Sequence, residues 1–439
     1  MRVGSDHPVG YRTRRKIALR LLPFIFLMYV INFVDRTNVG VAKLKMADEP
    51  WFTEKVFGFG AGVFFLGYLA LEIPGALIVE KWSARRWLAR ILISWGLCTI
   101  LVGLVRSPLE FYGARFLLGL AEAGFFPGII VYMTHWFSPA DRARATAVLQ
   151  LAVPCAQGLG SPLAGALFGL DWFGLAGWRW VFILEGLPAV VLGFVTLLYL
   201  TDRPREAGWL EPEERDWIER ALEEEKRRKA ARAHLTVWQA FREPNVLLLT
   251  AILFLASLSN YVFFFWLPTI VKEASGLSDE LVARYAGLPY AAAVVGAVAA
   301  SYSADRTGER RWHAVVPLVL LAILFTVSAL PGQPFWLVMV WLTLAGGAMF
   351  AYSVNYWVLP TLTLSASAAA ASIGMINSFG NLSGFIGQSN VGILRDEGYT
   401  FAQLGPLLSL CSLTAAALIC ALRLPARSAA PAPDEHEPV

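Results

Sequence analysis

Apolar segments of about 20 residues recur along the whole chain, and they restrict the folds open to it. A helix of about 20 apolar residues crosses the hydrocarbon core of a bilayer. Twelve such segments can be placed, at roughly 18–42, 57–79, 87–105, 109–136, 144–169 and 179–200, and then at 244–271, 282–303, 313–331, 334–360, 367–393 and 402–423. Backbone polar groups cannot stay unpaired in lipid, so each segment predicts a helix. Only 16% of residues are charged, against about 25% in soluble domains. We therefore expect an all-α membrane protein with twelve transmembrane helices.

The longest polar interruption divides the chain into two halves. We predict a first six-helix half at 1–200, a linker at 201–242, a second half at 243–425 and a disordered tail at 426–439. Charges at helical spacing around 213–229 predict a solvated amphipathic helix in the linker. Most of the 37 Lys and Arg residues lie at the termini and in the even-numbered connections. The positive-inside rule then predicts that both termini, the linker and the tail are cytoplasmic, in the inner (plasma) membrane.

The two halves repeat a charged loop. Glu80-Lys81-Trp82-Ser83-Ala84-Arg85-Arg86-Trp87 and Asp305-Arg306-Thr307-Gly308-Glu309-Arg310-Arg311-Trp312 superpose after a shift of 225 residues. The same shift places Asn260-Tyr261 on Asp35-Arg36. Repeated halves of this kind place a substrate site at their interface near the bilayer midplane. Both loops should be cytoplasmic, which predicts gating contacts on the inner side from Glu80, Arg85, Arg86, Asp305, Arg310 and Arg311.

Four charges lie inside two apolar segments, Asp35 and Arg36 in the first and Arg115 and Glu122 in the fourth. A charge at the bilayer centre costs about 2.5–3.5 kcal/mol on insertion scales, so such residues usually serve a function. Arg115 and Glu122 are two helical turns apart and share a face. An arginine offers a planar fork to a carboxylate. The alternative is that the four charges form two buried ion pairs that lock helices together.

Sequence motifs at these sites resemble the major facilitator superfamily over roughly residues 15–425, and within it the anion:cation symporter family. The motifs that carry the resemblance are the acid-x-x-x-x-Arg-Arg loops, Ile31–Gly40, Arg115–Gly124, Phe265-Trp266-Leu267-Pro268 and Asn377-Ser378-Phe379-Gly380-Asn381-Leu382-Ser383-Gly384. The resemblance implies import of sugar acids, dicarboxylates such as tartrate, or aromatic acids, usually with protons. It implies proton-coupling roles for Asp35 and Glu122 and anion contacts for Arg36, Arg115 and Asn381.

One position departs from the sugar-acid members of that family. They place a glutamine in the fifth span near the position of Val153-Pro154, whereas here Gln150 and Gln157 lie a turn away. Further candidates for the lining of the cavity are mostly aromatic and favour a flat aromatic or small carboxylate, with tartrate-like dicarboxylates close behind. These candidates are Tyr29, Asn32, Tyr261, Phe265, Tyr352, Tyr356 and Trp357.

We expect three other ionisable residues to have structural roles. We expect Glu72 to pair with loop arginines, Glu185 to pair with Arg179, and His135 to lie at the membrane interface. The four cysteines lack metal-ligand spacing and are interpreted as buried small residues. No nucleotide loop, HExxH motif or Cys-His set is present in the sequence, so we expect neither an enzyme nor a cofactor or metal. Nucleic acid is not an expected partner.

The sequence thus predicts a monomeric carrier in membrane lipid that imports a small organic anion together with protons. An exchanger or facilitator that moves the same anions without net proton flux is the alternative. An exchanger would need the cavity arginines but no titratable carboxylate, so Asp35 and Glu122 favour symport. A membrane enzyme or sensor is the third class, and no motif in the sequence supports it.

Overall fold

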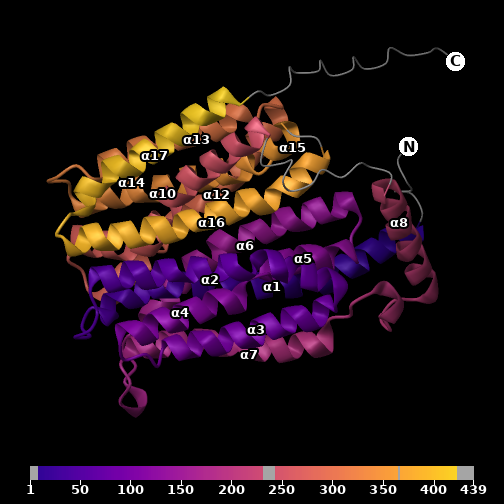
Figure 1. Ribbon diagram of the computed structural model, residues 1–439, viewed down its shortest axis with the longest axis horizontal. Helices are drawn as coiled ribbons and strands as arrows, with labels where there is room; N and C mark the ends of the chain where they lie inside the picture. The colour runs from indigo at the N-terminus through magenta and orange to yellow at the C-terminus, as the bar shows by residue number, and fades with distance from the viewer. Residues whose placement is uncertain (1–7, 231–242, 364–365, 423–439) are drawn as a thin grey trace.

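The computed structural model describes residues 8–230, 243–363 and 366–422, and this part of the chain is helical with short connections. Figure 1 shows two groups of helices lying side by side. The N-terminal group consists of α1 (Pro8–Met46), α2 (Glu54–Lys81), α3 (Ala84–Val102), α4 (Pro108–Glu122), α5 (Phe125–Thr134), α6 (Pro139–Ala166) and α7 (Gly177–Tyr199). The C-terminal group consists of α10 (Pro244–Ser275), α11 (Asp279–Tyr285), α12 (Leu288–Thr307), α13 (Arg311–Ser328), α14 (Phe335–Tyr356), α15 (Leu359–Thr363), α16 (Ala366–Asp396) and α17 (Phe401–Ala421).

Helices occur at every predicted span. Within the described residues, nine helical stretches are long and apolar enough to cross a bilayer. The long helices α3, α6 and α16 do not meet that composition. α3 begins with three arginines in its first seven residues, and α16 is rich in Ser, Gly and Asn. Small residues of this kind let neighbouring helices approach closely.

The fourth predicted span is broken into two helices. α4 ends at Glu122 and α5 begins at Phe125, because Gly124 adopts a left-handed conformation with φ 83°. Glycine takes this conformation at little steric cost. A Cβ atom at position 124 would also lie 3.4 Å from the Cα of Gly75 on α2. The break leaves Glu122 as the last residue of its helix.

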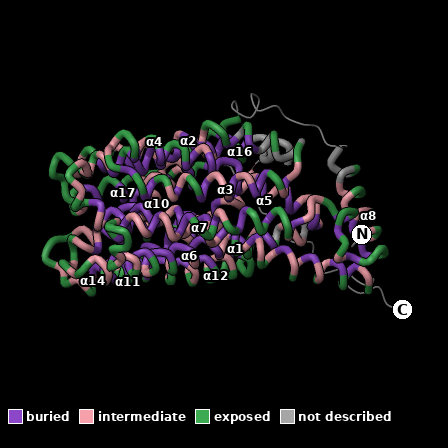
Figure 2. Tube along the Cα trace, turned by 90° about the horizontal axis from the view of Figure 1, so that it is seen from below, coloured by how far each residue is buried: buried purple, intermediate pink, exposed green. Residues whose placement is uncertain are grey.

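The two groups meet along a seam between α2 and α16. A Cβ on Gly58 would lie 2.4 Å from the carbonyl oxygen of Gln388 and 2.6 Å from the Cα of Gly392. Further along, Gly62 approaches Phe385, and Gly384 packs against the ring of Phe65. These contacts join the two groups over the part of the molecule farthest from α8. Figure 2 shows buried residues along the length of the bundle and exposed residues at its edges.

Ion pairs strengthen the same region. Lys43 on α1 is 3% exposed; its Nζ is 2.7 Å from Glu54 and donates to Thr269 of the C-terminal group at 2.9 Å. Lys45 pairs across the groups with Asp279 at 2.9 Å. Glycine contacts and ion pairs together close the bundle at the end of α1 near Met46, which we call the far end.

The linker contains α8 (Pro212–Ala230), which lies beside the start of α1 and defines the α8 end of the bundle (Figure 1). Glu214 has a fully buried side chain and contacts Arg12 at 3.1 Å and Lys16 at 2.9 Å. Burial acts to raise the pKa of Glu214, but the backbone N–H of Glu211 and the cations Lys16 and Arg12 outweigh it and hold that pKa below its ordinary value. Residues 231–242 of the linker and the predicted tail at 426–439 lie outside the described residues.

Candidate functional site

A cavity of about 900 Å³ lies between the two groups, on the α8 side of the seam. Its wall is formed by α1, α2, α4, α5 and α6 on one side and by α10, α14 and α16 on the other. All the ionisable and neutral residues that we predicted for the substrate site line it, namely Tyr29, Asn32, Asp35, Arg36, Arg115, Glu122, Tyr261, Phe265, Tyr352, Tyr356, Trp357 and Asn381. Residues from segments more than 200 positions apart thus share one cavity.

The Arg36–Glu122 pair is the main charged contact on the wall of the N-terminal group. Arg36 Nε donates to Glu122 Oε1 at 2.5 Å, and Asn32 donates to the same oxygen at 2.8 Å. Glu122 is fully buried, whereas the Arg36 side chain keeps 20% exposure to the cavity. The C-terminus of a helix disfavours a negative charge, so these two donors from α1 compensate for the position of Glu122 at the end of α4.

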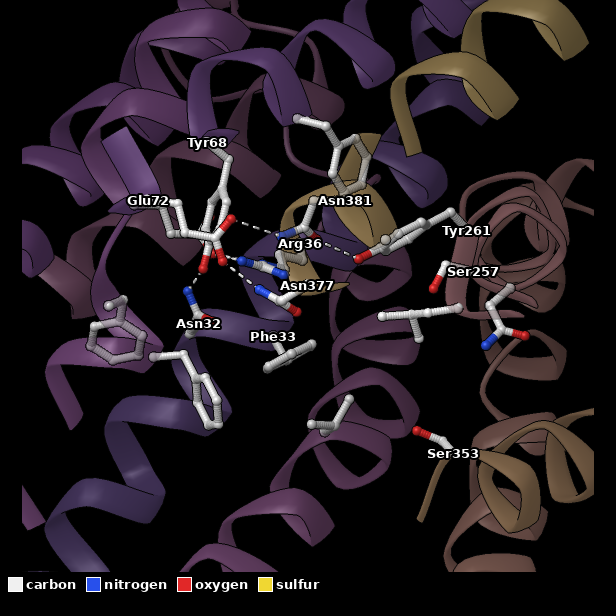
Figure 3. A pocket seen from close by; sticks show the side chains of 18 of the residues that line it. Asn32, Phe33, Arg36, Tyr68, Glu72, Ser257, Tyr261, Ser353, Asn377 and Asn381 are labelled. Atoms are coloured by element: carbon white, nitrogen blue, oxygen red, sulfur yellow. Dashed lines mark hydrogen bonds and ion pairs between the residues drawn. The ribbon is translucent and has the colours of Figure 1, made fainter. Parts of the chain in front are cut away.

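Aromatic rings hold the Arg36 guanidinium in place. It lies 5.2 Å from the ring centre of Phe33 and 5.1 Å from that of Tyr68. Stacking on aromatic faces suits a guanidinium better than an ammonium. Arg36 therefore has a fixed position in the cavity wall and remains accessible to a ligand (Figure 3).

Arg115 is more deeply buried, at 1% exposure. Its Nε donates to the carbonyl oxygen of Gly60 at 3.3 Å, and its guanidinium lies 5.0 Å from the ring centre of Phe64. Arg115 and Glu122 line the same cavity, as their spacing predicts, but the ion pair of Glu122 is formed with Arg36.

Asp35 is held by three donors within the N-terminal group. It accepts hydrogen bonds from Trp95 at 2.7 Å, Thr99 at 2.8 Å and Asn38 at 2.8 Å. With 2% exposure it lies at the edge of the cavity and faces α3. Glu122 and Asp35 therefore have different surroundings, because Glu122 contacts a cation and Asp35 contacts neutral donors.

Amide and hydroxyl groups of α16 form the opposite wall. Asn381 accepts a hydrogen bond from Tyr261 at 3.0 Å. Asn381, Asn377 and Ser378 all donate to Glu72 of α2 (Figure 3). The expectation that Glu72 pairs with loop arginines is therefore wrong: its carboxylate is 5% exposed and bridges the two groups inside the cavity. The spacing of residues along α2 does not predict a contact with residues about 300 positions away.

The tyrosines that line the cavity differ in the partners of their hydroxyl groups. Tyr261 uses its hydroxyl to contact Asn381, as above, whereas Tyr356 donates to the backbone carbonyl of Leu249 at 2.7 Å and is fully buried. Tyr352 is 1% exposed and packs on Tyr356. Gln150, Val153 and Gln157 of α6 also line the cavity.

Two other sequence expectations concern ionisable residues outside the cavity. The predicted pairing of Glu185 with Arg179 is wrong, because Arg179 pairs with Glu49 at 3.3 Å and donates to the carbonyl of Val105 at 2.7 Å. Glu185 is 5% exposed and lies beside Asn38 within the N-terminal group. His135 caps the end of α5 and is not among the residues that line the cavity.

The repeated loops lie at the α8 end. Arg85 contacts Asp202, with Nε 3.9 Å from a carboxylate oxygen. Arg310 contacts Asp305 and Asn355, and Arg311 donates to the carbonyl of Leu422 at 2.6 Å. Each of these contacts stays within one group. Arg86 is exposed, and the side chain of Glu80 lies outside the described part of the structure.

Comparison with known proteins shows extensive similarity. The family model described as Major Facilitator Superfamily matches residues 25–388. A protein of Agrobacterium vitis named "Putative tartrate transporter" is 43% identical over 89% of this chain and 90% of its own length. A protein of Acinetobacter baumannii named "Quinolone resistance transporter" is 35% identical over 87% of this chain and 88% of its own. The crystal structure of a D-xylose-proton symporter has a TM-score of 0.75 and 14% identity, covering 93% of this chain and 98% of that chain.

Proposed function

Since the chain belongs to the major facilitator superfamily and is a multi-pass secondary transporter, we propose that it imports a small organic dianion of the tartrate type by proton symport with alternating access. The observation that carries this proposal is the partly exposed Arg36 guanidinium, which lines the cavity together with the amides of α16. A planar guanidinium binds one carboxylate through two parallel hydrogen bonds. The amides and hydroxyl of α16 are suited to a second polar group on the same substrate.

This combination of a cation and neutral donors supports the proposed substrate class. A tartrate-like anion has carboxylates at both ends and hydroxyls between them, so it can contact Arg36 and the donors of α16 at once. The similar Agrobacterium vitis protein is named for tartrate. An aromatic carboxylate fits the aromatic lining and is the second candidate, and the cavity is within the size range of ligand sites.

Competition for Arg36 supports proton coupling. A substrate carboxylate that binds Arg36 takes the cation away from Glu122, and a buried carboxylate without a cation becomes costly to keep charged. Glu122 then takes a proton, and it releases that proton when the substrate leaves and Arg36 returns. Asp35, with its neutral donors, is proposed as the second proton-coupling residue.

Alternating access follows from the closed seam. We assign the α8 end to the cytoplasm from the charge distribution, which places the closed far end outside. The cavity is then accessible from inside, and the repeated loops at Glu80, Arg85, Arg86, Asp305, Arg310 and Arg311 are proposed to meet when the carrier opens outward. The carrier is proposed to act as a monomer in the plasma membrane.

Proteoliposome transport tests this proposal. Purified protein would be given labelled tartrate, a sugar acid, benzoate and a quinolone, each with and without an imposed pH gradient. Symport predicts accumulation of tartrate only when the side of addition is acidic. The alternative, exchange or facilitated diffusion, predicts counterflow without accumulation. Uptake of none of these anions would contradict the proposed substrate class.

A further inference from the structure

Glu72 occupies donors in the cavity that suit a bound carboxylate. Its Oε1 accepts from the side-chain amide of Asn377, and its Oε2 accepts from Ser378 at 3.3 Å and from Asn381 at 3.4 Å. These three residues lie on α16, and Figure 3 shows Asn377 and Asn381 close to Arg36 and Glu72.

The chemistry of this contact is that of substrate recognition. Two amide N–H groups and a hydroxyl around one carboxylate form a neutral anion-binding set. Glu72 reaches it from α2, where it lies one helical turn after Tyr68, a ring that contacts Arg36. If a dianionic substrate binds Arg36 through one carboxylate, its second carboxylate would need the same donors.

Charge balance in the cavity points the same way. Its wall carries two guanidiniums, Arg36 and Arg115, and three carboxylates, Asp35, Glu72 and Glu122. With all five ionised, the wall has a net charge of −1 and repels an anion. A dianion enters favourably only if carboxylates of the wall are neutralised. Proton coupling through Asp35 and Glu122 neutralises two of the three. Neutral Glu72 would raise the net charge of the wall to +2, which balances a dianion.

We propose that Glu72 is a specificity-determining residue: it is an internal ligand that holds the donors of α16 in the empty carrier and yields them to the second carboxylate of a dianionic substrate. This inference rests on the proposed function and names which substrates engage the α16 wall. When the dianion binds, Glu72 takes up a proton from the bulk solution to which the cavity is open, and its hydrogen bonds from Asn377 and Asn381 pass to the substrate. A monocarboxylate bound at Arg36 alone does not compete with Glu72.

Counterflow in proteoliposomes tests the inference, because counterflow needs binding and alternation but no proton gradient. The variant Glu72→Gln keeps the side-chain length and removes the charge. It should lower the KM for L-tartrate at about pH 7.5 by about fivefold or more, a typical coupling between competing ligands. The KM for benzoate should change little.

The outcomes separate the two proposals. If wild-type protein moves neither tartrate nor benzoate, the proposed function is wrong and this inference falls with it. If wild-type protein moves both, an unchanged or raised KM for tartrate in Glu72→Gln overturns this inference alone, as does an equal change for benzoate. A structural role for Glu72 would lower transport of both anions without this selective change.

Two further variants control the experiment. Asp171→Asn removes an exposed carboxylate outside the cavity and should leave both KM values unchanged. Should Glu72→Gln not reach the membrane, Glu72→Asp withdraws the carboxylate from α16 by one methylene. It should lower the KM for tartrate in the same direction by a smaller factor, and an unchanged KM in that variant would equally overturn the inference.

Discussion

The guanidinium of Arg36 on α1 contacts the carboxylate of Glu122 on α4, with Nη2 and Nε each 2.5 Å from Oε1. This pair joins the proposed anion anchor directly to a proposed proton carrier. It forms where the chain breaks after α4, at the left-handed Gly124. Because one cation serves both the internal carboxylate and an incoming one, substrate binding and proton uptake share a single contact.

Arg36→Lys and Arg115→Lys should each lower tartrate binding by at least about tenfold. A hydrogen bond to a charged group contributes about 1.5–3 kcal/mol, and an ammonium cannot reproduce the bidentate fork. Counterflow or equilibrium binding in detergent measures the effect. Near-normal binding by both lysine variants would rule out the anchor role of these arginines.

Glu122→Gln should keep binding and counterflow but lose accumulation driven by a pH gradient, because glutamine cannot exchange a proton. Asp35→Asn should act similarly or stop the transport cycle. The measurement is tartrate uptake with and without an imposed gradient, with Asp171→Asn as the control. If both neutral variants still concentrate tartrate against its gradient, the protons travel by another route.

Neutralising Arg85, Arg86, Arg310 and Arg311 to glutamine should favour the state that is open at the α8 end. The proposed contacts of the outward-open state would be lost, and a few kcal/mol of differential contact is enough to shift a two-state equilibrium. In a background without the four native cysteines, labelling of Ile373→Cys, which lines the cavity, should rise. Unchanged labelling would mean that the loops only set topology.

Gly58→Ala should open the far end. A Cβ at this position would lie 2.4 Å from a backbone oxygen and 2.6 Å from a backbone Cα of α16, and backbone atoms of a helix cannot move aside. The closed seam should therefore weaken, and Ser389→Cys should become labelled from outside. Gly113→Ala is the matched control, since a Cβ there meets nothing within 4 Å. Equal labelling in the two alanine variants would contradict a role of Gly58 in closure.

Acid should detach α8 from α1. The pKa of Glu214 is depressed by its partners in the folded protein, so its contribution is present above the ordinary glutamate pKa of about 4.3 and is lost as pH falls through the lower folded value. Hydrogen exchange of α8 should accelerate over that acid range. Glu214→Gln should show the faster exchange already at neutral pH, whereas Glu213→Gln, at an exposed neighbour, should behave as wild type. Slow exchange in Glu214→Gln would show that the ion pairs do not hold α8.

Local patterns in the sequence determined the helices. Predicted spans such as 244–271 and 402–423 correspond to α10 (Pro244–Ser275) and α17 (Phe401–Ala421). Each helix satisfies its own backbone hydrogen bonds, so a run of apolar residues is enough to predict it. The cost of burying charge similarly pointed to Asp35, Arg36, Arg115 and Glu122, all of which line the cavity.

The partner of each buried charge depends on how the helices pack in three dimensions. Sequence spacing placed Glu122 on the face of Arg115, yet its ion pair is with Arg36, 86 residues away. Glu72 was expected near loop arginines and instead meets Asn377, 305 residues away. The physical reason is that helix formation depends on neighbours along the chain, whereas pairing between helices depends on packing, on close contacts such as Gly58 with Gly392, and on which donors that packing brings within about 3 Å of an acceptor.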